Sequence, residues 1–456
     1  MKILENLLRR RFGLRGLRPG QREVIESVLA GRDTLAIMPS GAGKSLCYQL
    51  PTLHRRGTTI VVSPLISLMK DQSDKLEERG VDAAPVNSAL SARERRESMR
   101  RIRGREADFI FTTPEQLANP EFVEKLKHNP IDLFVVDEAH CITQWGQDFR
   151  PAYRELGAAL RALGNPTLLA LTATATPDVI EDIARQLGRP RMRVLNAGVY
   201  RPNLYFEVLQ TTNEAEKKQA LLEVVRSGGA GIVYCATVRA AKEVHAWLAE
   251  QGEEAQLYHG RLGGRERAQR QDAFMRGAAR TMVATNAFGM GIDRQDIRYI
   301  VHYQLPGSLE AYYQEAGRAG RDGEEARCTL LYDHADRRVQ LYFARKRSKV
   351  ELLTAYARGT QCRWKMILEY FDEKVEASDE CGACDNCVQR KGDADARTLK
   401  MKAHVVLKKG DAVRVPKYGR GTVAQVYDDR IAVTFASGDT REFAPRYVAP
   451  VSVLAK

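Results

Sequence analysis

The sequence predicts an α/β fold of two tandem, doubly wound domains, followed by a helical region and a small β-rich module. Three observations support this prediction. Short apolar runs alternate with longer amphipathic stretches from about Thr34 to Ile300, a helical pattern follows Asp336, and short alternating runs begin at Val405. Near-continuous apolar runs are typical of parallel strands that helices cover on both faces.

The apolar runs are rich in β-branched residues, as strands are. Strand candidates are 34–38, 59–63, 109–113, 133–137, 167–172, 231–236, 281–285 and 299–303. The stretch 65–80 is typical of the amphipathic helices between them. These strands are too many for one compact unit, and the segment 196–204 offers a natural break between two domains. We therefore expect two α/β domains.

The remaining third of the chain changes character twice. Residues 341–371 predict one or two helices, and 388–402 has few apolar anchors and resembles a linker. After Val405, the expected turns YGRG (418–421), YDD (427–429) and ASGD (436–439) split short alternating strands, which predicts a small β-barrel. The expected segments are 1–197 and 198–336 for the α/β domains, 337–390 for a helical subdomain, 391–403 for a linker and 404–456 for the barrel.

Composition limits the classes of protein. The chain has 456 residues, 44% of them apolar, and 71 Lys and Arg against 58 Asp and Glu give a net charge of +13. This apolar content argues against a mainly disordered chain. We find neither a run of about 18 apolar residues, which a membrane span needs, nor a signal peptide. We expect a cytoplasmic protein with no membrane partner, and the basic excess indicates a phosphate-rich partner.

A glycine-rich turn, MPSGAGKS, occupies residues 38–45 between an expected strand and an expected helix. The backbone N–H groups of such a turn surround phosphates. Lys44 would reach the β and γ oxygens of a nucleotide, and the Ser45 hydroxyl would ligate Mg²⁺. The alternative is a chance glycine-rich turn.

Two adjacent carboxylates, Asp137 and Glu138, end the buried strand LFVVD. Asp137 is suited to hold Mg²⁺ and Glu138 to polarise the attacking water. Alone, such a pair is more often a surface feature, but with the Lys44 loop it forms the second half of a nucleotide site. The end of a parallel strand is also where α/β proteins bind ligands.

Nucleotide hydrolysis also needs positive charge on the transferred phosphoryl group. Residues 312–323 offer Gln314, Arg318 and Arg321. We expect the two arginines to share one face of a helix, because they stand three residues apart. A solvated basic turn is the plain alternative.

Four cysteines gather near the end of the helical region. They are Cys362, Cys381, Cys384 and Cys387. Four thiolates suit a closed, tetrahedral structural zinc site, although an iron–sulfur cluster also uses cysteines at such gaps. The other cysteines stand singly in apolar or small-residue surroundings and are expected to be buried thiols; they are Cys47, Cys141, Cys235 and Cys328.

Taken together, these motifs resemble the superfamily-2 DNA helicases of the RecQ type. The resemblance runs from about Leu7 to Cys387 and rests on FGLRGLRPGQ (12–21), MPSGAGKS, SPLISLMKDQ (63–72), DEAHCITQWGQDFRPAY (137–153), LTATAT (171–176), VATNAFGMGIDR (283–294) and YYQEAGRAGRDG (312–323). DEAH alone is shared with many RNA helicases, but its continuation is not. The glycine-rich loop, which begins with Met38, is of the helicase variety.

The resemblance implies two RecA-like P-loop domains and an ATP-dependent DNA helicase with DNA-stimulated ATP hydrolysis. It further implies 3′-to-5′ translocation on single-stranded DNA and unwinding of duplex DNA in recombination and repair. The expected cofactors are ATP, Mg²⁺ and Zn²⁺. The expected partners are single-stranded DNA and duplex junctions, and we expect a monomer in a bacterial-type, nucleoid-associated setting.

The resemblance also implies residue roles. Arg18 and Gln21 would hold adenine, and Gly289 and Asp293 would lie near the ribose and the inter-domain cleft. The phosphate loop would comprise Pro39, Ser40, Gly41, Ala42, Gly43, Lys44 and Ser45. Ser40, Ala42 and Asp293 stand where the family usually has Thr, Gly and Asn, which are conservative changes.

An aromatic-rich loop follows the carboxylate pair, from Gln144 to Tyr153, and resembles the family's DNA-sensing loop. Trp145 and Phe149 offer faces for base stacking, worth about 1–3 kcal/mol each, and Arg150 offers a cation beside them. The alternative is that both aromatic residues are core side chains. The resemblance also favours zinc at the four cysteines, with a structural role.

The family pattern does not extend to the C-terminal module. Many RecQ enzymes continue with a winged-helix domain, whereas residues 408–443 resemble the Tudor/SH3-like barrel of UvrD/PcrA-type helicases. That barrel could bind a protein partner, bind duplex DNA or cap the zinc subdomain; for DNA the contacts would be Lys408, Lys409, Arg414, Lys417 and Arg420.

Three competing hypotheses remain. One is a DNA-dependent translocase or annealing factor with weak unwinding, recruited by its barrel. The second is a recruitment protein without a motor role, and the third is an RNA helicase.

Overall fold

The structure is a computed structural model of the whole chain. It describes residues 2–55, 57–143, 151–289, 292, 294–343, 347–373, 380–391, 407–415, 418–427, 430–443 and 448–450. These residues fall into two compact units, 1–387 and 388–456, which are described separately.

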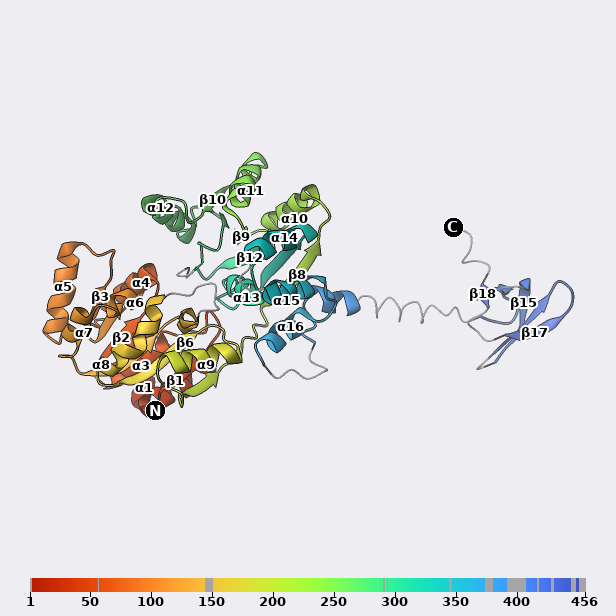
Figure 1. Cartoon of the computed structure of the whole chain (residues 1–456). Coiled ribbons are helices and arrows are strands. Elements are labelled where there is room, and N and C mark those ends of the chain that lie inside the picture. The colour runs from red at the N-terminus through yellow and green to blue at the C-terminus, as the bar shows by residue number, and fades with distance from the viewer. Residues whose placement is uncertain are drawn as a thin grey trace. The chain divides into compact units, whose positions relative to one another are not determined.

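A parallel seven-stranded sheet forms the base of the first α/β part, with the order β3-β4-β2-β5-β6-β1-β7 (Figure 1). Its strands are β1 (Thr34–Ile37), β2 (Thr58–Val62), β3 (Ala83–Val86), β4 (Phe109–Thr112), β5 (Ile131–Val136), β6 (Thr167–Thr172) and β7 (Arg193–Asn196). The accompanying helices are α1 (Lys2–Phe12), α2 (Gln21–Leu29), α3 (Leu46–Arg55), α4 (Ile66–Glu77), α5 (Ala92–Arg103), α6 (Pro114–Leu117), α7 (Pro120–Leu126), α8 (Leu156–Ala162) and α9 (Pro177–Gln186), with the 3-10 turns η1 (Ala139–Ile142) and η2 (Pro151–Glu155). Pro85 is tolerated because β3 is an edge strand.

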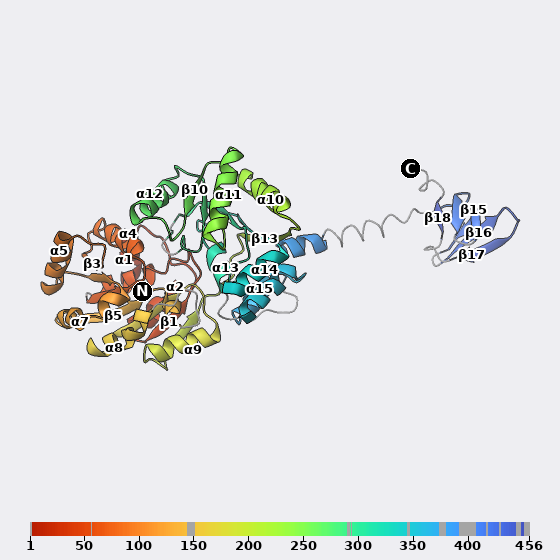
Figure 2. The ribbon, with the colours of Figure 1, turned by 45° about the horizontal axis from the view of Figure 1, so that its top comes forward.

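The second α/β part has a parallel six-stranded sheet with the order β10-β11-β9-β12-β13-β8 (Figure 2). Its strands are β8 (Leu204–Gln210), β9 (Ala230–Tyr234), β10 (Ala255–Tyr258), β11 (Thr281–Ala284), β12 (Ile297–His302) and β13 (Ala326–Tyr332). Its helices are α10 (Glu214–Arg226), α11 (Val238–Glu250), α12 (Gly264–Met275) and α13 (Leu309–Ala316).

Apolar side chains bury both faces of each sheet. Along β2, Ile60 and Val62 belong to one buried cluster and Val61 to another. Successive side chains of a strand point to opposite faces, so such a strand needs a helical layer on each side. This explains why the strand runs are almost continuously apolar.

The helical region packs onto the second part. It consists of α14 (His334–Phe343), α15 (Arg347–Arg358), α16 (Arg363–Tyr370) and the helical residues 385–387. Val350, Trp364 and Cys387 belong to the same buried cluster as Phe206 of β8. The helical region and the second sheet therefore share one core.

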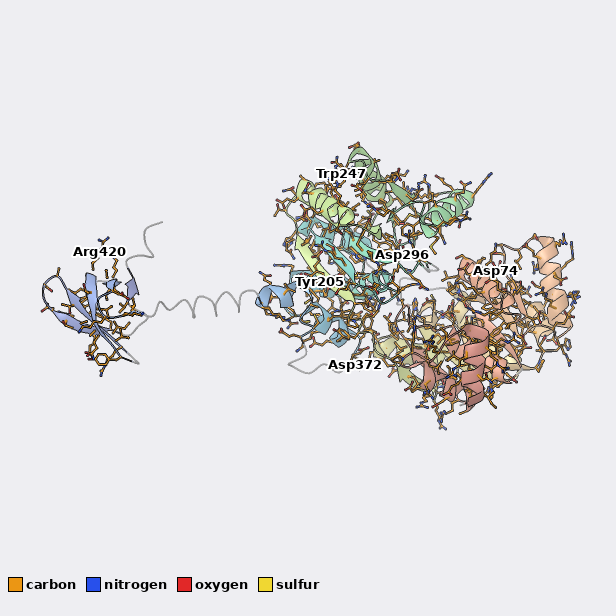
Figure 3. All side chains as sticks on the ribbon, turned by 180° about the vertical axis from the view of Figure 1, so that it is seen from behind. Asp74, Tyr205, Trp247, Asp296, Asp372 and Arg420 are labelled. Carbon is orange, nitrogen blue, oxygen red and sulfur yellow. The ribbon has the colours of Figure 1, made fainter. Side chains whose placement is uncertain are left out.

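An antiparallel five-stranded sheet forms the C-terminal unit, with the order β17-β16-β15-β14-β18. The strands are β14 (Ala412–Val415), β15 (Gly419–Val426), β16 (Ile431–Phe435), β17 (Thr440–Phe443) and β18 (Ala449–Pro450). Val413, Val423 and Val433 anchor a small core of its own, whereas Arg420 is exposed (Figure 3). β17 and β18 are the edges of this sheet, and closure into a barrel stays a prediction.

The structure has all eight predicted strands, with ends shifted by at most two residues. Residues 341–371 contain two complete helices, α15 and α16, which agrees with the expected one or two, and also the end of α14. The non-helical residues 359–362 separate α15 from α16. Gly419 to Gly421, expected in a turn, lie in β15. The four lone cysteines are buried, as expected. Among the described helices, none is both long and apolar enough to cross a lipid bilayer.

Candidate nucleotide site and metal centre

A cavity of about 460 Å³ is lined by residues from both α/β parts. From the first part it includes Arg18, Gln21, Ser40, Gly41, Gly43, Lys44, Ser45, Asp137 and Glu138, and from the second Gln314, Arg318 and Arg321. Pro39 and Ala42 belong to the same loop without lining the cavity. Most of the residues that the sequence assigned to a nucleotide thus meet around one space.

The phosphate loop connects the end of β1 to α3. Gly41 and Gly43 have φ values of +84° and +77°, which favour glycine. A Cβ atom on Gly43 would lie 2.6 Å from Gln21 Nε2, so the loop also needs glycine for close approach. Lys44 Nζ donates to Met38 O at 3.3 Å across the turn.

Arg18 and Gln21 are bonded directly to this loop. Gln21 Nε2 donates to Ala42 O at 2.9 Å and to Gly43 O at 3.0 Å, while its Oε1 accepts from Arg18 N at 2.7 Å. The Arg18 guanidinium donates to Gly41 O. The expected adenine motif and the phosphate loop therefore form one connected piece of structure.

The carboxylate pair follows β5 and is held in an unusual backbone conformation. Glu138 has a φ of +49°, which is uncommon for a residue with a side chain and often marks a functional site. Burial and the charge of Glu138 raise the pKa of Asp137 to about 7. Burial would also raise the pKa of Glu138, but the surrounding positive charges, Lys44 foremost, outweigh it and lower that pKa. Two adjacent, half-buried carboxylates fit a divalent cation, which removes their repulsion.

His140 also lines the cavity, although the sequence gave it no role. Its Nδ1 lies 3.4 Å from Glu138 Oε2 and 3.0 Å from Thr172 Oγ1, at the end of β6. The only available signal was its position in the DEAH segment. His140 links the carboxylate pair to the loop after β6.

Arg318 and Arg321 lie in the turn after α13, not on a helix as expected. The helix ends at Ala316 because Gly317 and Gly320 follow, and Gly320 has a φ of +54°. The Arg318 guanidinium donates to Gly289 O, and Arg321 NH1 donates to Ile292 O at 2.6 Å. The two arginines nevertheless line the same cavity.

One side chain of α13 crosses directly to the first part. Gln314 Nε2 donates to Thr174 Oγ1 at 3.4 Å, in the loop that follows β6. Thr172 Oγ1 in turn donates to Thr174 O at 2.9 Å. The loop after β6, which sequence reasoning used only for the resemblance, thus connects Gln314 with His140 and Glu138.

The expected DNA-sensing residues Trp145, Phe149 and Arg150 lie outside the described residues, as does Asp293. The described structure resumes at η2, where Tyr153 is fully buried and its hydroxyl donates to Asp137 O at 2.9 Å. Sequence reasoning missed this bond. It ties the end of the aromatic-rich loop to the backbone of the carboxylate pair.

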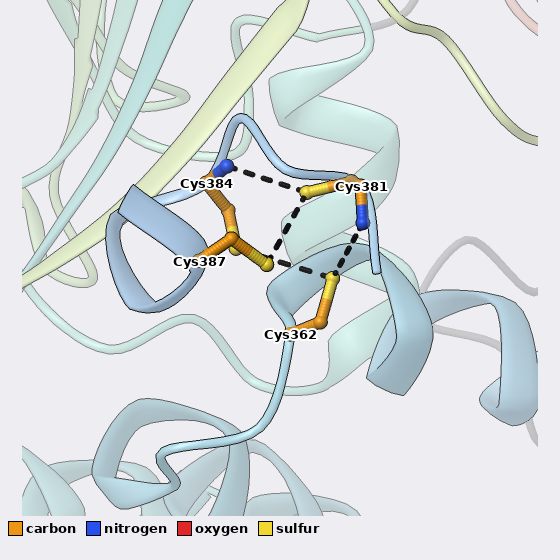
Figure 4. A group of neighbouring side chains, drawn as sticks. All are labelled: Cys362, Cys381, Cys384 and Cys387. Atoms are coloured by element: carbon orange, nitrogen blue, oxygen red, sulfur yellow. Dashed lines mark hydrogen bonds between the residues drawn. The ribbon is translucent and has the colours of Figure 1, made fainter. Parts of the chain in front are cut away.

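The four clustered cysteines converge on a single point (Figure 4). Their Sγ atoms all lie within 4.8 Å of one another, with Cys381 and Cys387 at 3.9 Å and Cys362 and Cys384 at 4.0 Å. A zinc tetrahedron with bonds of about 2.3 Å places sulfur atoms about 3.8 Å apart. Backbone N–H groups also point at sulfur, as from Cys384 N to Cys381 Sγ at 3.3 Å. The donor set and its geometry fit zinc.

The cysteine cluster is fastened to the edge strand β8. Asp385 Oδ2 accepts from Val208 N at 2.9 Å, and the same carboxylate pairs with Arg363 through two bonds of 2.9 Å. Trp364 Nε1 donates to Leu204 O at 3.2 Å. The metal centre therefore covers polar backbone that the edge of the sheet would otherwise expose.

Comparisons with known proteins match three regions of the chain to helicase families. A DEAD/DEAH box helicase model matches residues 18–183, a helicase conserved C-terminal domain matches 216–323 and a RecQ zinc-binding model matches 333–388. The ATP-dependent DNA helicase RecQ of Bacillus subtilis (strain 168) is 40% identical over 437 residues, which cover 92% of this chain and 72% of the relative. The probable ATP-dependent DNA helicase RecS of the same organism is 43% identical over 344 residues, 75% of this chain and 69% of the relative.

Solved structures support the fold alone, because their sequences are distant. The helicase MrfA bound to DNA and AMPPNP has a TM-score of 0.61 at 17% identity, covering 95% of this chain and 73% of MrfA. A Dbp5 variant of S. cerevisiae bound to Gle1 and IP6 has a TM-score of 0.60 at 21% identity, covering 78% of this chain and 98% of Dbp5. From the length of the match to RecQ and the zinc-binding model, the chain belongs to the RecQ family of ATP-dependent DNA helicases.

Proposed function

We propose that this chain hydrolyses ATP in the cavity between its two α/β parts, moves 3′-to-5′ along single-stranded DNA and unwinds duplex DNA in recombination and repair. The observation that carries the proposal is the cavity itself. It brings the phosphate loop, a half-buried carboxylate pair and two arginines from the other part around one space.

We assign nucleotide binding to the connected piece formed by the adenine motif and the phosphate loop. Arg18 and Gln21 receive the adenine, and the ribose lies toward Gly289 and Asp293. Residues 39–45 bind the phosphates of the nucleotide. Gln21 would then connect the base to the phosphate loop, because its amide is already bonded to the loop carbonyls.

We assign the chemistry to residues on both sides of the cavity. Ser45 and Asp137 would hold Mg²⁺, which would supply positive charge to the β and γ phosphates. Glu138 orients and polarises the attacking water, and Lys44 neutralises phosphate charge. Gln314, Arg318 and Arg321 approach from the second part; an arginine in this role raises the rate about 10³- to 10⁵-fold.

We assign DNA sensing to Trp145, Phe149 and Arg150. Tyr153 supports this role, because it links the end of their loop to Asp137 O. A DNA strand that moves the loop would thereby move the backbone of the carboxylate pair. Stimulation of hydrolysis by DNA follows from that connection.

We assign zinc to Cys362, Cys381, Cys384 and Cys387, in a structural role, because the four thiolates leave no open position. The domain division we propose is 1–197, 198–336, 337–390, a linker at 391–403 and a barrel at 404–456. The shared core of the second sheet and the helical region suits a zinc site that stabilises the motor.

We propose that the C-terminal unit recruits a partner, on the strength of its charge. Arg414 and Arg420 lie directly opposite each other on β14 and β15 and are exposed. Like charges in this position repel, and neither arginine has a carboxylate within ion-pair distance among the described residues. An acidic protein surface would relieve the repulsion, and DNA is the alternative. We further propose a monomer that works in the cytoplasm, at the nucleoid.

A second candidate is a DNA-dependent translocase or annealing factor that separates strands weakly. The observation in its favour is that the described part of 407–450 consists of strands and turns without a helix, unlike a winged-helix domain.

Unwinding assays on 3′-tailed, 5′-tailed, forked and blunt duplexes distinguish the two candidates, with Glu138→Gln as a control that should bind ATP without hydrolysing it. The helicase proposal expects strand separation on forked and 3′-tailed substrates. Rapid ATP hydrolysis with no strand separation on any substrate would favour the translocase, and unwinding only from 5′ tails would contradict the proposed polarity.

A further inference from the structure

The segment that joins the two α/β parts, residues 197–203, begins in contact with the first part. Ala197 N donates to Ile37 O at 2.9 Å, at the end of the strand that leads into the phosphate loop. A Cβ atom on Gly20 would lie 2.6 Å from Ala197 Cβ, so the turn before Gln21 also touches this segment. We call residues 197–203 the connector.

From Val199 onward, the connector is bonded to the second part and to the helical region. Val199 O accepts from the Tyr313 hydroxyl on α13, and Val199 N donates to Glu373 Oε1 at 2.6 Å. Gly198 stands between the two sets of contacts with a φ of +82°, which favours glycine. At Gly198, the connector therefore passes from contacts with the first part to contacts with the second part and the helical region.

Arg201 makes the most extensive of these attachments. Its NH1 donates to Gly317 O at 2.8 Å, and its NH2 donates to Ala319 O at 2.8 Å and to Gly320 O at 2.5 Å. The side chain is only 8% exposed, and none of the described carboxylates lies within ion-pair distance of it. Burial lowers the pKa of Arg201, which reflects the cost of placing a charge there.

The three carbonyl groups that hold Arg201 surround the turn that carries Arg318 and Arg321. A helix end leaves carbonyl oxygens without intrahelical partners, and a cation near it is favourable. Asn203 Nδ2 adds bonds of 2.8 Å to Gly320 O and to Glu324 O. A Cβ atom on Gly320 would lie 2.5 Å from that Nδ2 atom. The turn is thus fixed to the connector at several points.

We infer that Arg201 is a positioning residue for ATP hydrolysis, which fixes the turn at 317–320 so that Arg318 and Arg321 face the nucleotide cavity. The inference rests on the proposed function, because that function assigns both arginines to ATP.

The test is the DNA-stimulated ATPase rate of Arg201→Ala, alone and in an Arg318→Ala background. The single variant should lose about 10- to 100-fold in kcat, because a displacement of about 1 Å costs on that order. Its KM for ATP should change little. In the Arg318→Ala background, the same substitution should have a much smaller effect, since residues that act as a unit are not additive.

Arg55→Ala is the matched control. Arg55 NH2 also donates to carbonyl groups at a helix end, Val28 O at 2.6 Å and Leu29 O at 2.7 Å, but it touches neither arginine. Its kcat should stay within about two-fold of the unchanged protein even if its melting temperature falls.

Two results overturn the inference: an unchanged kcat in folded Arg201→Ala, or an equal loss of kcat in both backgrounds. If Arg201→Ala does not fold, Tyr313→Phe offers a second test, because it removes the bond from α13 to Val199 O of the connector. That variant should lower kcat about 3- to 10-fold, the equivalent of one buried hydrogen bond, and an unchanged kcat overturns the inference. Failure of the proposed function is distinguishable, because Arg318→Ala alone would then hydrolyse ATP normally.

Discussion

The two α/β parts contribute to the nucleotide cavity in different ways. In the first part, β1 leads into a glycine-rich loop that is already bonded to Arg18 and Gln21. In the second part, the central strand β9 is followed by Cys235, Ala236 and Thr237, without glycine. The second part instead offers two arginines from the turn after α13.

The supporting cores differ as well. Two buried clusters on either side of the first sheet contain residues of the first part alone. The second sheet shares a cluster with the helices and cysteines of the metal centre. Under the proposed function, this difference predicts that the first part holds a nucleotide by itself, whereas the second part sets the rate and depends on the metal centre for its position.

Loss of the phosphate-loop lysine should have the largest effect. Lys44→Ala removes the cation that lies among the phosphates, so ATP affinity should fall and DNA-stimulated hydrolysis should drop at least about 10³-fold. Binding of single-stranded DNA should remain. Nucleotide titration and a coupled ATPase assay measure both effects, with Lys127→Ala as an exposed-lysine control. Unimpaired hydrolysis in Lys44→Ala would place the site elsewhere.

Loss of the metal should affect the second part more than the first. Cys384→Ser removes one of the four thiolates, and structural zinc binding is worth about 10–16 kcal/mol in small zinc peptides. Bound zinc should fall well below that of the unchanged protein, and the melting temperature and kcat should both fall. Binding of a nucleotide analogue below the melting temperature should persist.

Cys328→Ala is the control for the metal experiment, since Cys328 is a lone buried thiol in β13. It should keep its zinc, as metal analysis of the purified protein would show. Loss of analogue binding in Cys384→Ser at a temperature where the protein is folded would contradict the independence of the first part.

A smaller effect is expected from the bond between the DNA-sensing loop and the carboxylate pair. Tyr153→Phe removes one buried hydroxyl that donates to Asp137 O. Such a bond is worth about 1 kcal/mol, so DNA stimulation should fall roughly 3- to 10-fold while basal hydrolysis remains. Tyr299→Phe removes a comparable buried bond, to Thr281 Oγ1 at 2.6 Å, and should keep full stimulation. Equal DNA stimulation of hydrolysis in the two variants would contradict the proposed coupling between the loop and the carboxylate pair.

The smallest effect on hydrolysis is expected from removing the C-terminal unit. Residues 388–456 form a separate compact unit with a core of its own. Deletion of 403–456 should leave the DNA-stimulated ATPase rate within about two-fold and retain bound zinc. A loss beyond tenfold would mean that this unit contributes to the motor directly.

The sequence predicted those features that depend on local pattern. Apolar runs located the strands, the spacing of Gly41, Gly43 and Lys44 located the phosphate loop, and the gaps between cysteines located the metal centre. In each case most of the residues stand close together in the chain, with Cys362, 19 residues before Cys381, as the exception.

Features that depend on tertiary contact were not predictable in the same way. Nothing near Tyr153 or Arg201 in the sequence indicates a bond to Asp137 O or to Gly317 O. The arginines were expected on a helix because their spacing fits one, yet Gly317 and Gly320 end it first. The glycines at these two positions indicate the end of a helix, and the three-residue spacing of the arginines does not take them into account.

The central claim is that the second part completes the site which the first part begins. Arg318→Ala tests it most directly, by measuring the affinity for a non-hydrolysable ATP analogue and kcat for DNA-stimulated hydrolysis on the same preparation. The account predicts an analogue affinity within about threefold of the unchanged protein and a kcat lower by about 10³-fold. An unchanged kcat would show that the first part hydrolyses ATP alone and would contradict the account.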